Sequence, residues 1–197
     1  MPHAVSDEAL DTLFRNARSH NRWTDEPVSD APLMALYDLM RWGPTAGNTT
    51  PARFLFLTTP AAKERLKPHL DGGNVEKSMT APALAIIAYD LDFPDTLSIL
   101  KPYAPNAKKY YENKAEMVRE DAFRNGSLQG AYFMMAARAL GLDCGPMGGF
   151  DHAGVDKEFF AGTNIKSNFL CALGHGNPAA LYPRAPRLSF DQACKIL

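Results

Sequence analysis

The sequence predicts a single domain that combines helices with a β-sheet. Its 197 residues are 46% hydrophobic and 22% charged, which is the balance of an ordinary globular chain. Three short apolar runs, at 53–58, 83–89 and 168–173, are typical of strands, and the first two are expected to share a sheet. The chain has no repeat, low-complexity stretch or linker rich in Gly and Ser, so residues 1–197 are expected to form one domain.

Helices are predicted where a starting signal precedes apolar residues spaced three or four apart. The four starting points are Ser6, Ser29, Thr59 and Asp151. The longest helix covers about residues 114–140, because no proline interrupts it, and Gly141 is its expected C-cap. Its second half is apolar almost all round, so we expect that half to be buried.

The ends of these elements are set by Gly, Pro and short polar residues. The first helix is expected to end near Ala17, the second at Gly43-Pro44, and the third near Pro68. Residues 143–151, DCGPMGGFD, are interpreted as a glycine-rich loop. Ser189 has the capping-box spacing to Gln192, which predicts a terminal helix carrying Phe190, Ala193, Cys194 and Leu197.

Charge and cysteine content restrict the partners and the compartment. With 21 basic and 22 acidic residues the net charge is −1, so nothing global attracts the chain to nucleic acid or to an anionic membrane. Three cysteines without CxxC spacing fit a reducing compartment. The first residues lack a signal peptide, and no apolar run approaches the ~20 residues that span a bilayer. We therefore expect a cytoplasmic protein with neither nucleic-acid nor membrane partners.

Common catalytic and nucleotide-binding motifs are missing from the sequence. It contains no GxxxxGK[ST], GxSxG or HExxH, and its histidines lack metal-ligand spacing, so no metal is expected. Residues 174–179 imitate the GxGxxA phosphate turn. However, Pro178 lies inside that turn and only 18 residues follow it, too few for a dinucleotide-binding unit.

Basic residues gather instead at helix and loop boundaries. They are Arg18, His20 and Arg22 after the first helix, Lys77 one helical turn beyond Asn74, and Arg184 with Arg187 near the C-terminus. These segments could form a phosphate cradle, since guanidinium groups hold anions bidentately. The alternative that residue spacing leaves open is a solvated rim of unrelated charges.

The same segments occur in the order found in the flavin-dependent nitroreductase-like family, which the sequence resembles over nearly its whole length. Members carry R-x-S-x-[RK] after the first helix, then P-S-x-x-N, then an asparagine three residues before a lysine. This chain has residues 18–22, 44–48, and Asn74 with Lys77. The family continues with A-L-G-L, P-x-x-G-F-D and a C-terminal basic pair, here 139–142, 146–151, and Arg184 with Arg187.

The resemblance implies an α+β fold, a three-layer α-β-α sandwich around a mixed, mainly antiparallel sheet. It implies an intertwined homodimer with one FMN at each of the two interfacial active sites, and NADH or NADPH as hydride donor. The flavin itself carries the chemistry, so no protein side chain is assigned a catalytic role.

Cofactor contacts follow residue by residue from the motifs. The phosphate, the ribityl chain and the pyrimidine edge are assigned to Arg18, Ser19, His20, Arg22, Lys77, Arg184 and Arg187. The ring edge is assigned to Asn74, and the N5 side to the segment of Pro146, Met147, Gly148 and Gly149. A second copy of the chain is expected to contribute Pro44, Thr45, Ala46 and Asn48.

These assignments are chemically reasonable, and the chain departs from the family at two of them. Cations near N1 and O2 favour the reduced, anionic flavin, and glycines near N5 leave room for a stacked substrate. Many members have Glu where Gly148 stands, so the substrate proton must come from elsewhere or from water. His20 replaces the usual serine.

Within the family the sequence is most similar to the malonic semialdehyde reductase branch, through WGPT, GPM-GFD and PRLSF. That similarity implies reduction of malonic semialdehyde to 3-hydroxypropionate in pyrimidine degradation, in a ping-pong cycle. One alternative is a broad nitroaromatic or quinone reductase. An alternative from another class is a non-catalytic dimer that binds an anion or a nucleotide.

An acceptor with a carboxylate calls for a cation beyond the phosphate cradle. Arg53 stands where many relatives have Trp, and Arg124 interrupts an otherwise apolar helix, so either could bind that carboxylate. The competing interpretation is that Arg53 caps a strand end and Arg124 forms a structural ion pair.

Overall fold

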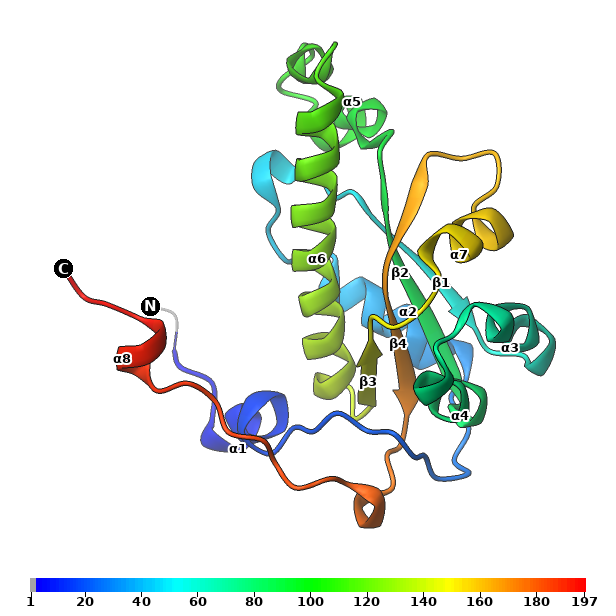
Figure 1. The fold of residues 1–197 in the computed structure, drawn as a ribbon. Helices are drawn as coiled ribbons and strands as arrows, with labels where there is room; N and C mark the ends of the chain where they lie inside the picture. Colours follow the sequence, from blue (N-terminus) through cyan, green and yellow to red (C-terminus); the bar gives the residue numbers. More distant parts are fainter. Residues whose placement is uncertain (1–2) are drawn as a thin grey trace.

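The computed structural model describes residues 3–197 and is built around a four-stranded sheet (Figure 1). The strands are β1 (Ala52–Leu57), β2 (Ala83–Asp90), β3 (Asp143–Met147) and β4 (Ile165–Gly174). Their order across the sheet is β1-β2-β4-β3, so β1 and β3 are its edges. Each neighbouring pair runs antiparallel, and the predicted pairing of β1 with β2 is confirmed.

Helices cover both faces of the sheet because β2 is apolar on both faces. Residues 83–88 are all fully buried, the odd-numbered ones on one face and the even-numbered ones on the other. One face packs on α2 (Asp30–Met40) and α6 (Ala115–Ala139), and the other on α3 (Pro60–Leu66) and α7 (His152–Phe159). The predicted three-layer α+β sandwich is confirmed.

The other helices are short. They are α1 (Asp7–Leu10), which continues as a π-helical turn (Asp11–Arg15), then α4 (Gly72–Thr80), α5 (Leu97–Leu100) and α8 (Phe190–Ala193). The Ser6 cap is confirmed, because its hydroxyl accepts a hydrogen bond from the Ala9 N–H at 3.2 Å. The predicted ends of the first three helices agree with the structure to within about three residues.

Helix α6 ends as predicted but is buried on one face only. Gly141 has φ +80°, and the Leu142 N–H donates to the Ala137 carbonyl at 2.9 Å, which completes a Schellman cap. Phe133 and Ala137 are fully buried, whereas Leu140 is 41% exposed. The expectation that the whole second half is buried is wrong for the opposite face, which the chain's own layers do not cover.

Residues 143–147 form a strand where the sequence predicted a loop. Gly145 and Pro146 conceal the strand pattern, and β3 tolerates a proline because it is an edge strand. Asp151 precedes α7 as predicted, but its side chain makes no capping bond. The Ser189 capping box is present, yet α8 ends at Ala193 instead of reaching Leu197. The residues beyond it are exposed, and so short a helix is marginal without packing.

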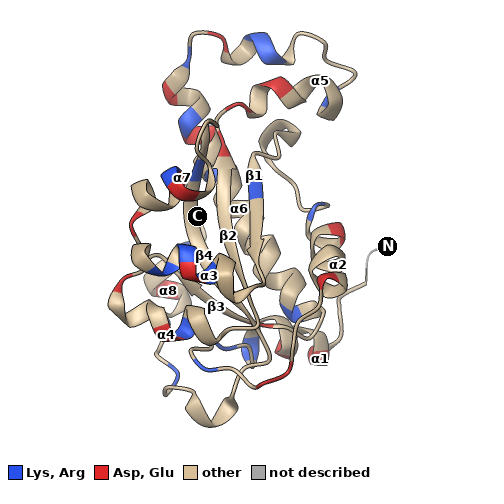
Figure 2. Ribbon diagram, turned by 90° about the vertical axis from the view of Figure 1, so that its right-hand side faces the viewer, with Lys and Arg blue, Asp and Glu red and all other residues tan. Residues whose placement is uncertain are grey.

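Two segments leave the body of the sandwich. Residues 181–197 run out past α1, away from the sheet (Figure 1). The connection 91–114, which contains α5, projects beyond one end of the sheet in both views, and charged residues lie mainly on helices and connections (Figure 2). Among the helices of residues 3–197, none combines the length and apolarity that crossing a membrane requires.

Candidate active site

The basic segment after the first helix lies along the edge strand β3. Ser19 forms a parallel bridge with Cys144, and the His20 N–H donates to the Cys144 carbonyl at 3.0 Å. Gly145 permits this approach, because a Cβ there would lie 2.5 Å from the His20 carbonyl oxygen. The predicted segment is thus fixed to the sheet by backbone contacts.

The His20 side chain points into the protein. It is 6% exposed, and its Nε2 lies 3.4 Å from the Asp143 carboxylate, whose other oxygen accepts the Gly176 N–H at 2.8 Å. Its Nδ1 is buried without a hydrogen-bond partner in the described chain. His20 therefore contacts the first residue of β3, and Arg18 and Arg22 contact other residues.

Helix α4 brings the predicted Asn74 and Lys77 to the end of β3. The Asn74 amide donates to the Gly149 carbonyl at 2.9 Å, and the Lys77 ammonium lies 3.5 Å from the Pro146 carbonyl. Lys77 is 7% exposed, and within residues 3–197 no carboxylate lies within 4 Å of its ammonium. Burial lowers the pKa of Lys77, because it disfavours the charged form. A buried cation without an anionic partner is a ready-made site for an external anion.

The arginines around this site are more exposed than Lys77 and contact groups at the surface. Arg22 forms an ion pair with Glu76 on α4 at 2.6 Å. Arg18 donates to the Tyr182 carbonyl, and Arg184 donates to the Ala17 carbonyl at 3.0 Å, so the start of the C-terminal tail lies against the basic segment. Within residues 3–197 Arg187 donates to the carbonyls of Ala185 and Pro186, the two residues before it. These contacts join Arg18, Arg22 and Arg184 to the basic segment and to α4, whereas Arg187 makes no such contact in the described residues.

The loop at 44–50 is held in a strained conformation. Gly47, Asn48 and Thr50 have φ of 55°, 53° and 37°, a region that a β-branched residue such as Thr50 rarely adopts. Thr45 Oγ1 accepts the Thr50 N–H at 3.2 Å, and the Asn48 amide donates to the Leu100 carbonyl at 3.0 Å. Strain that is maintained by surrounding contacts is typical of functional loops.

Side chains of α6 hold the loop at 44–50 and the start of β1 in place. The sequence analysis assigned these side chains no role. Asn125, fully buried, accepts the Ala46 N–H at 2.7 Å; Gln129, 5% exposed, accepts the Ala52 N–H at 2.9 Å. Tyr132 donates to the Pro44 carbonyl at 2.9 Å. The sequence feature that could have marked them is their spacing of four and three residues, which places three polar side chains on one face of a helix.

The loop and the basic group lie at opposite edges of the sheet. The loop leads into β1, whereas Asn74 and Lys77 lie against the end of β3. Two strands, β2 and β4, separate these edges. Within one chain, the structure therefore does not bring Pro44, Thr45, Ala46 or Asn48 close to Asn74 and Lys77.

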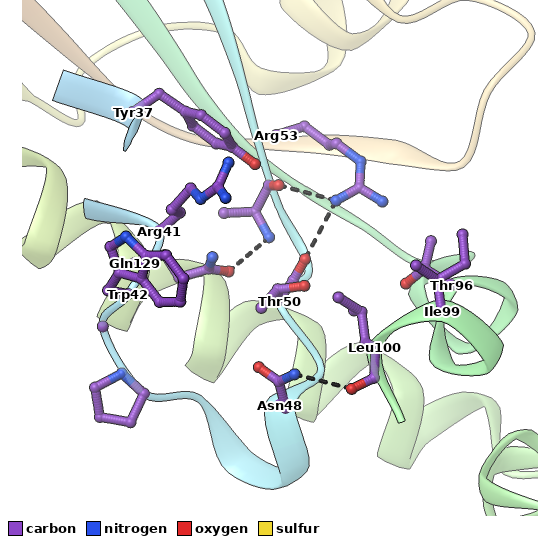
Figure 3. Close-up of a pocket in the computed structure, with 13 residues that line it drawn as sticks. Tyr37, Arg41, Trp42, Asn48, Thr50, Arg53, Thr96, Ile99, Leu100 and Gln129 are labelled. Atoms are coloured by element: carbon purple, nitrogen blue, oxygen red, sulfur yellow. Dashed lines mark hydrogen bonds between the residues drawn. The ribbon is translucent and has the colours of Figure 1, made fainter. Parts of the chain in front are cut away.

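A pocket of about 490 Å³ opens beside this loop (Figure 3). Its walls come from the end of α2, the loop, the start of β1, α5 and α6, through Tyr37, Arg41, Trp42, Gly43, Pro44, Asn48, Thr50, Ala52, Arg53, Thr96, Ile99, Leu100 and Gln129. A cavity of this size accommodates a small metabolite.

The two arginines proposed for substrate binding differ in their placement. Arg53 lines the pocket and forms an ion pair with Asp90 at 2.8 Å, while it also donates to the Ala52 and Thr50 carbonyls at 2.9 and 3.3 Å. Arg124 lies outside the lining and pairs with Asp121 and Glu120 of its own helix at 2.9 and 3.6 Å.

Residues 14–176 match the Nitroreductase family, and the chain belongs to that family. A protein of Stenotrophomonas maltophilia strain K279a, provisionally named NADH dehydrogenase/NAD(P)H nitroreductase, is 58% identical over the whole of both chains. A nitroreductase-type structure from Bacillus subtilis has a TM-score of 0.88 at 20% identity, covering 98% of this chain and 100% of its own. An FMN complex of a nitroreductase-type protein from Exiguobacterium sibiricum has a TM-score of 0.87 at 20% identity, with both chains fully covered.

Proposed function

We propose that this protein is an FMN-dependent NAD(P)H oxidoreductase. The observation that carries the proposal is Lys77, a buried ammonium beside the Pro146 carbonyl with no carboxylate within 4 Å in residues 3–197. Family membership and the FMN complex of the Exiguobacterium neighbour support it. When bound, FMN would accept a hydride from NAD(P)H at N5 and pass it to an acceptor.

The residues of the site fit this cofactor chemically. Lys77, Arg18, Arg22 and Arg184 would hold the phosphate and the electron-rich edge of the ring, and Arg187 would join them once the tail is in place. Asn74, fixed by its bond to the Gly149 carbonyl, would bond the ring edge. His20 and Ser19 hold the basic segment on β3, His20 also through its buried ring beside Asp143 and Ser19 through its backbone, so both would reach the cofactor mainly by positioning that segment.

The segment from Pro146 to Gly149 would face the reacting side of the ring. Gly149 must remain small, because a Cβ there would lie 2.5 Å from an Asp71 oxygen, whereas Gly148 has open space around its Cα. The space at Gly148 leaves room for a substrate to stack. The proton that a glutamate at this position could give must then come from another group or from water.

We propose malonic semialdehyde as the acceptor, reduced to 3-hydroxypropionate, with Arg53 at the pocket wall as a carboxylate-binding cation. Arg124 is the weaker choice, because two carboxylates of its own helix already neutralise it. A broad nitroaromatic or quinone reductase is the second candidate, favoured by the provisional name of the Stenotrophomonas relative. Side-by-side kcat/KM values for the aldehyde and a nitroarene separate the two.

A test of Arg53 follows from its position. Replacing Arg53 by Ala is expected to raise KM for malonic semialdehyde by about tenfold, because a charge-assisted hydrogen bond is lost, and to leave KM for a neutral quinone unchanged. Steady-state kinetics with both acceptors checks this. Equal effects on the two would assign Arg53 to holding β1 through Asp90 instead.

We also propose that the enzyme is a homodimer with its active sites at the interface. The tail exposes large apolar side chains, including Tyr182 at 72%, Leu188 at 70% and Phe190 at 57%. Trp42 on the pocket rim is 77% exposed, and α6 leaves one face uncovered. Apolar surfaces of this kind are typical of partner contacts, and a second copy would bring its 44–48 loop to the basic group.

The deciding experiment is the visible spectrum of the purified protein. We expect a yellow protein whose released chromophore is FMN, which bleaches with NADPH in the absence of oxygen and recovers its colour with malonic semialdehyde. Recovery with nitroarenes alone would favour the second candidate. A colourless protein that cannot be reconstituted with FMN would instead indicate a non-catalytic dimer that binds another anion.

A further inference from the structure

The charged residues that line the pocket beside β1 are basic, in a chain whose net charge is −1. Its 13 lining residues include Arg41 and Arg53 and contain no Asp or Glu. From this we infer that the pocket binds the carboxylate of a small acyclic acceptor and that Arg41 is a second residue that contacts it, from the wall opposite Arg53. The inference rests on the proposed function and deepens it by naming a specificity-determining residue.

Arg41 is freer to meet an external anion than Arg53 is. The Arg53 guanidinium already donates to Asp90, whose side chain is only 16% exposed, and to two backbone carbonyls, which occupy part of its five N–H donors. Arg41 has one carboxylate contact, to Asp38 at 3.5 Å, with side chains 48% and 72% exposed. An exposed ion pair this long contributes little, so Arg41 can exchange it for a ligand.

The position of Arg41 directs it toward the cavity. Arg41 is the C-cap of α2, where a cation is favourable, and its guanidinium lies 5.3 Å from the centre of the Trp42 ring. In Figure 3 its side chain extends between Tyr37 and Trp42, while Arg53 extends toward Thr96 on the other side of β1's first residues. The two cations thus mark different walls of one pocket.

A third cation stands next to the same loop. The Lys101 ammonium lies so close to Gly47 that a Cβ there would be 2.5 Å from it, and within residues 3–197 no carboxylate lies within 4 Å of it. Lys101 therefore adds positive charge near the pocket, whereas the φ of 55° at residue 47 is what favours a glycine there. Focused charge of one sign raises the local concentration of an oppositely charged ligand.

Two anions could use these cations, the carboxylate of the acceptor and a phosphate of the nicotinamide donor. Isothermal titration of the purified dimer with malonate, malonamide and ADP distinguishes them. Malonate and malonamide have the same carbon skeleton and differ in charge, and ADP carries the donor's phosphates. None of the three is turned over, so binding is read independently of catalysis.

Arg41→Gln is expected to weaken malonate binding about 10- to 100-fold, the range of a lost charge-assisted hydrogen bond, and to leave malonamide and ADP unchanged. Arg41→Lys should restore part of the affinity. The matched control is Arg65→Gln. Like Arg41, Arg65 is exposed, pairs with an acidic residue, Glu158, and lies near an aromatic ring, 4.9 Å from the centre of Phe159. Unlike Arg41, it does not line the pocket. Arg65→Gln should bind malonate as the wild type does.

Three outcomes would overturn the inference. They are malonate binding no tighter than malonamide in the wild type, equal loss in Arg41→Gln and Arg65→Gln, and loss of ADP rather than malonate binding in Arg41→Gln. Light scattering on each variant confirms that the oligomer is intact. A protein that lacks FMN but binds malonate through Arg41 would refute the proposed function and support the role of the pocket. An active flavoprotein whose malonate binding does not depend on Arg41 would refute the role of the pocket and support the proposed function.

Discussion

Lys77 is expected to combine a cost in stability with the proposed role in binding FMN. Its ammonium is buried with one long contact, to the Pro146 carbonyl at 3.5 Å. Lys77→Met is expected to raise the Kd for FMN about 10- to 100-fold, since a charge-assisted contact to phosphate is lost. The same change should increase the free energy of unfolding of the FMN-free protein, because a desolvated charge is removed. Flavin fluorescence titration and urea unfolding measure the two effects.

Lys63 is the matched control for this prediction. It is also a buried lysine, 8% exposed, but its ammonium donates to the Ala81 and Met79 carbonyls at 2.7 and 3.2 Å. Lys63→Met should leave FMN affinity unchanged and lower stability, because two carbonyls lose their donor. If Lys77→Met binds FMN as tightly as Lys63→Met does, Lys77 does not hold the phosphate.

The pKa of Lys77 predicts how FMN binding responds to pH. Burial lowers this pKa below the ordinary value of 10.5. The cation that binds phosphate is lost as pH rises through the lowered pKa, so FMN affinity should fall at a lower pH than for an exposed lysine. In the FMN-free protein, at pH values between the lowered pKa and 10.5, Lys77 carries its proton in the unfolded chain but not in the folded chain. The free energy of unfolding should therefore rise with pH across that interval. FMN titrations and urea unfolding at several pH values check both slopes, which should vanish in Lys77→Met.

At the scale of elements, α6 acts as the support of the strained loop. Asn125 is fully buried and bridges the Asp121 carbonyl and the Ala46 N–H at 2.9 and 2.7 Å. Asn125→Ala should lower the free energy of unfolding by about 1–3 kcal/mol, because the hydrogen bonds to the Ala46 N–H and the Asp121 carbonyl are both lost, and it should also weaken FMN binding. Urea unfolding and FMN titration measure these effects.

Asn168→Ala provides the comparison. Asn168 is a half-buried amide that bonds Ser127 on the same helix at 2.9 Å and has no contact with the loop. Asn168→Ala should lower the free energy of unfolding by less than Asn125→Ala does, and it should leave FMN affinity unchanged. A weaker FMN complex in both variants would point to a general loosening of α6 rather than to support of the loop.

Elements with strong periodicity could be predicted from the sequence, and those defined by tertiary contact could not. The buried strand at 83–88 and the uninterrupted helix over 115–139 carry their signals in their own residues. β3 contains Gly145 and Pro146, and is a strand only because it pairs with β4 and receives the basic segment on its other side. The terminal helix stops at Ala193, because none of its residues is buried against the rest of residues 3–197.

For the candidate site, the sequence predicts which residues take part better than how they are arranged. The order of the motifs marks Lys77, Asn74 and the end of β3, which the structure brings together. It does not distinguish the inward-facing His20 from the arginines beside it, because that depends on Asp143 and Gly176 at the ends of two strands. Nor does it indicate Asn125 or Arg41, whose roles arise from the packing of α6 and α2 around the loop.

At the scale of the whole molecule, one chain holds two half-sites on opposite edges of its sheet. One contains Lys77 beside β3, and the other contains the loop with Asn48, which leads into β1. If a flavin needs both, each site in a two-fold symmetric dimer takes one half from each copy. This arrangement predicts complementation between variants that are inactive alone.

Lys77→Met and Asn48→Ala should each impair FMN binding and turnover as separate homodimers. When they are unfolded and refolded together, a mixed dimer has one site carrying both changes and one site carrying neither. Random mixing should therefore restore about a quarter of wild-type activity and FMN content. Mixing Lys77→Met with Asn74→Ala is the matched control, because both changes fall in the same half-site and every site then keeps one defect. Restoration in neither mixture would show that one chain supplies a complete site, and restoration in the control would show that Lys77 and Asn74 do not belong to the same half-site.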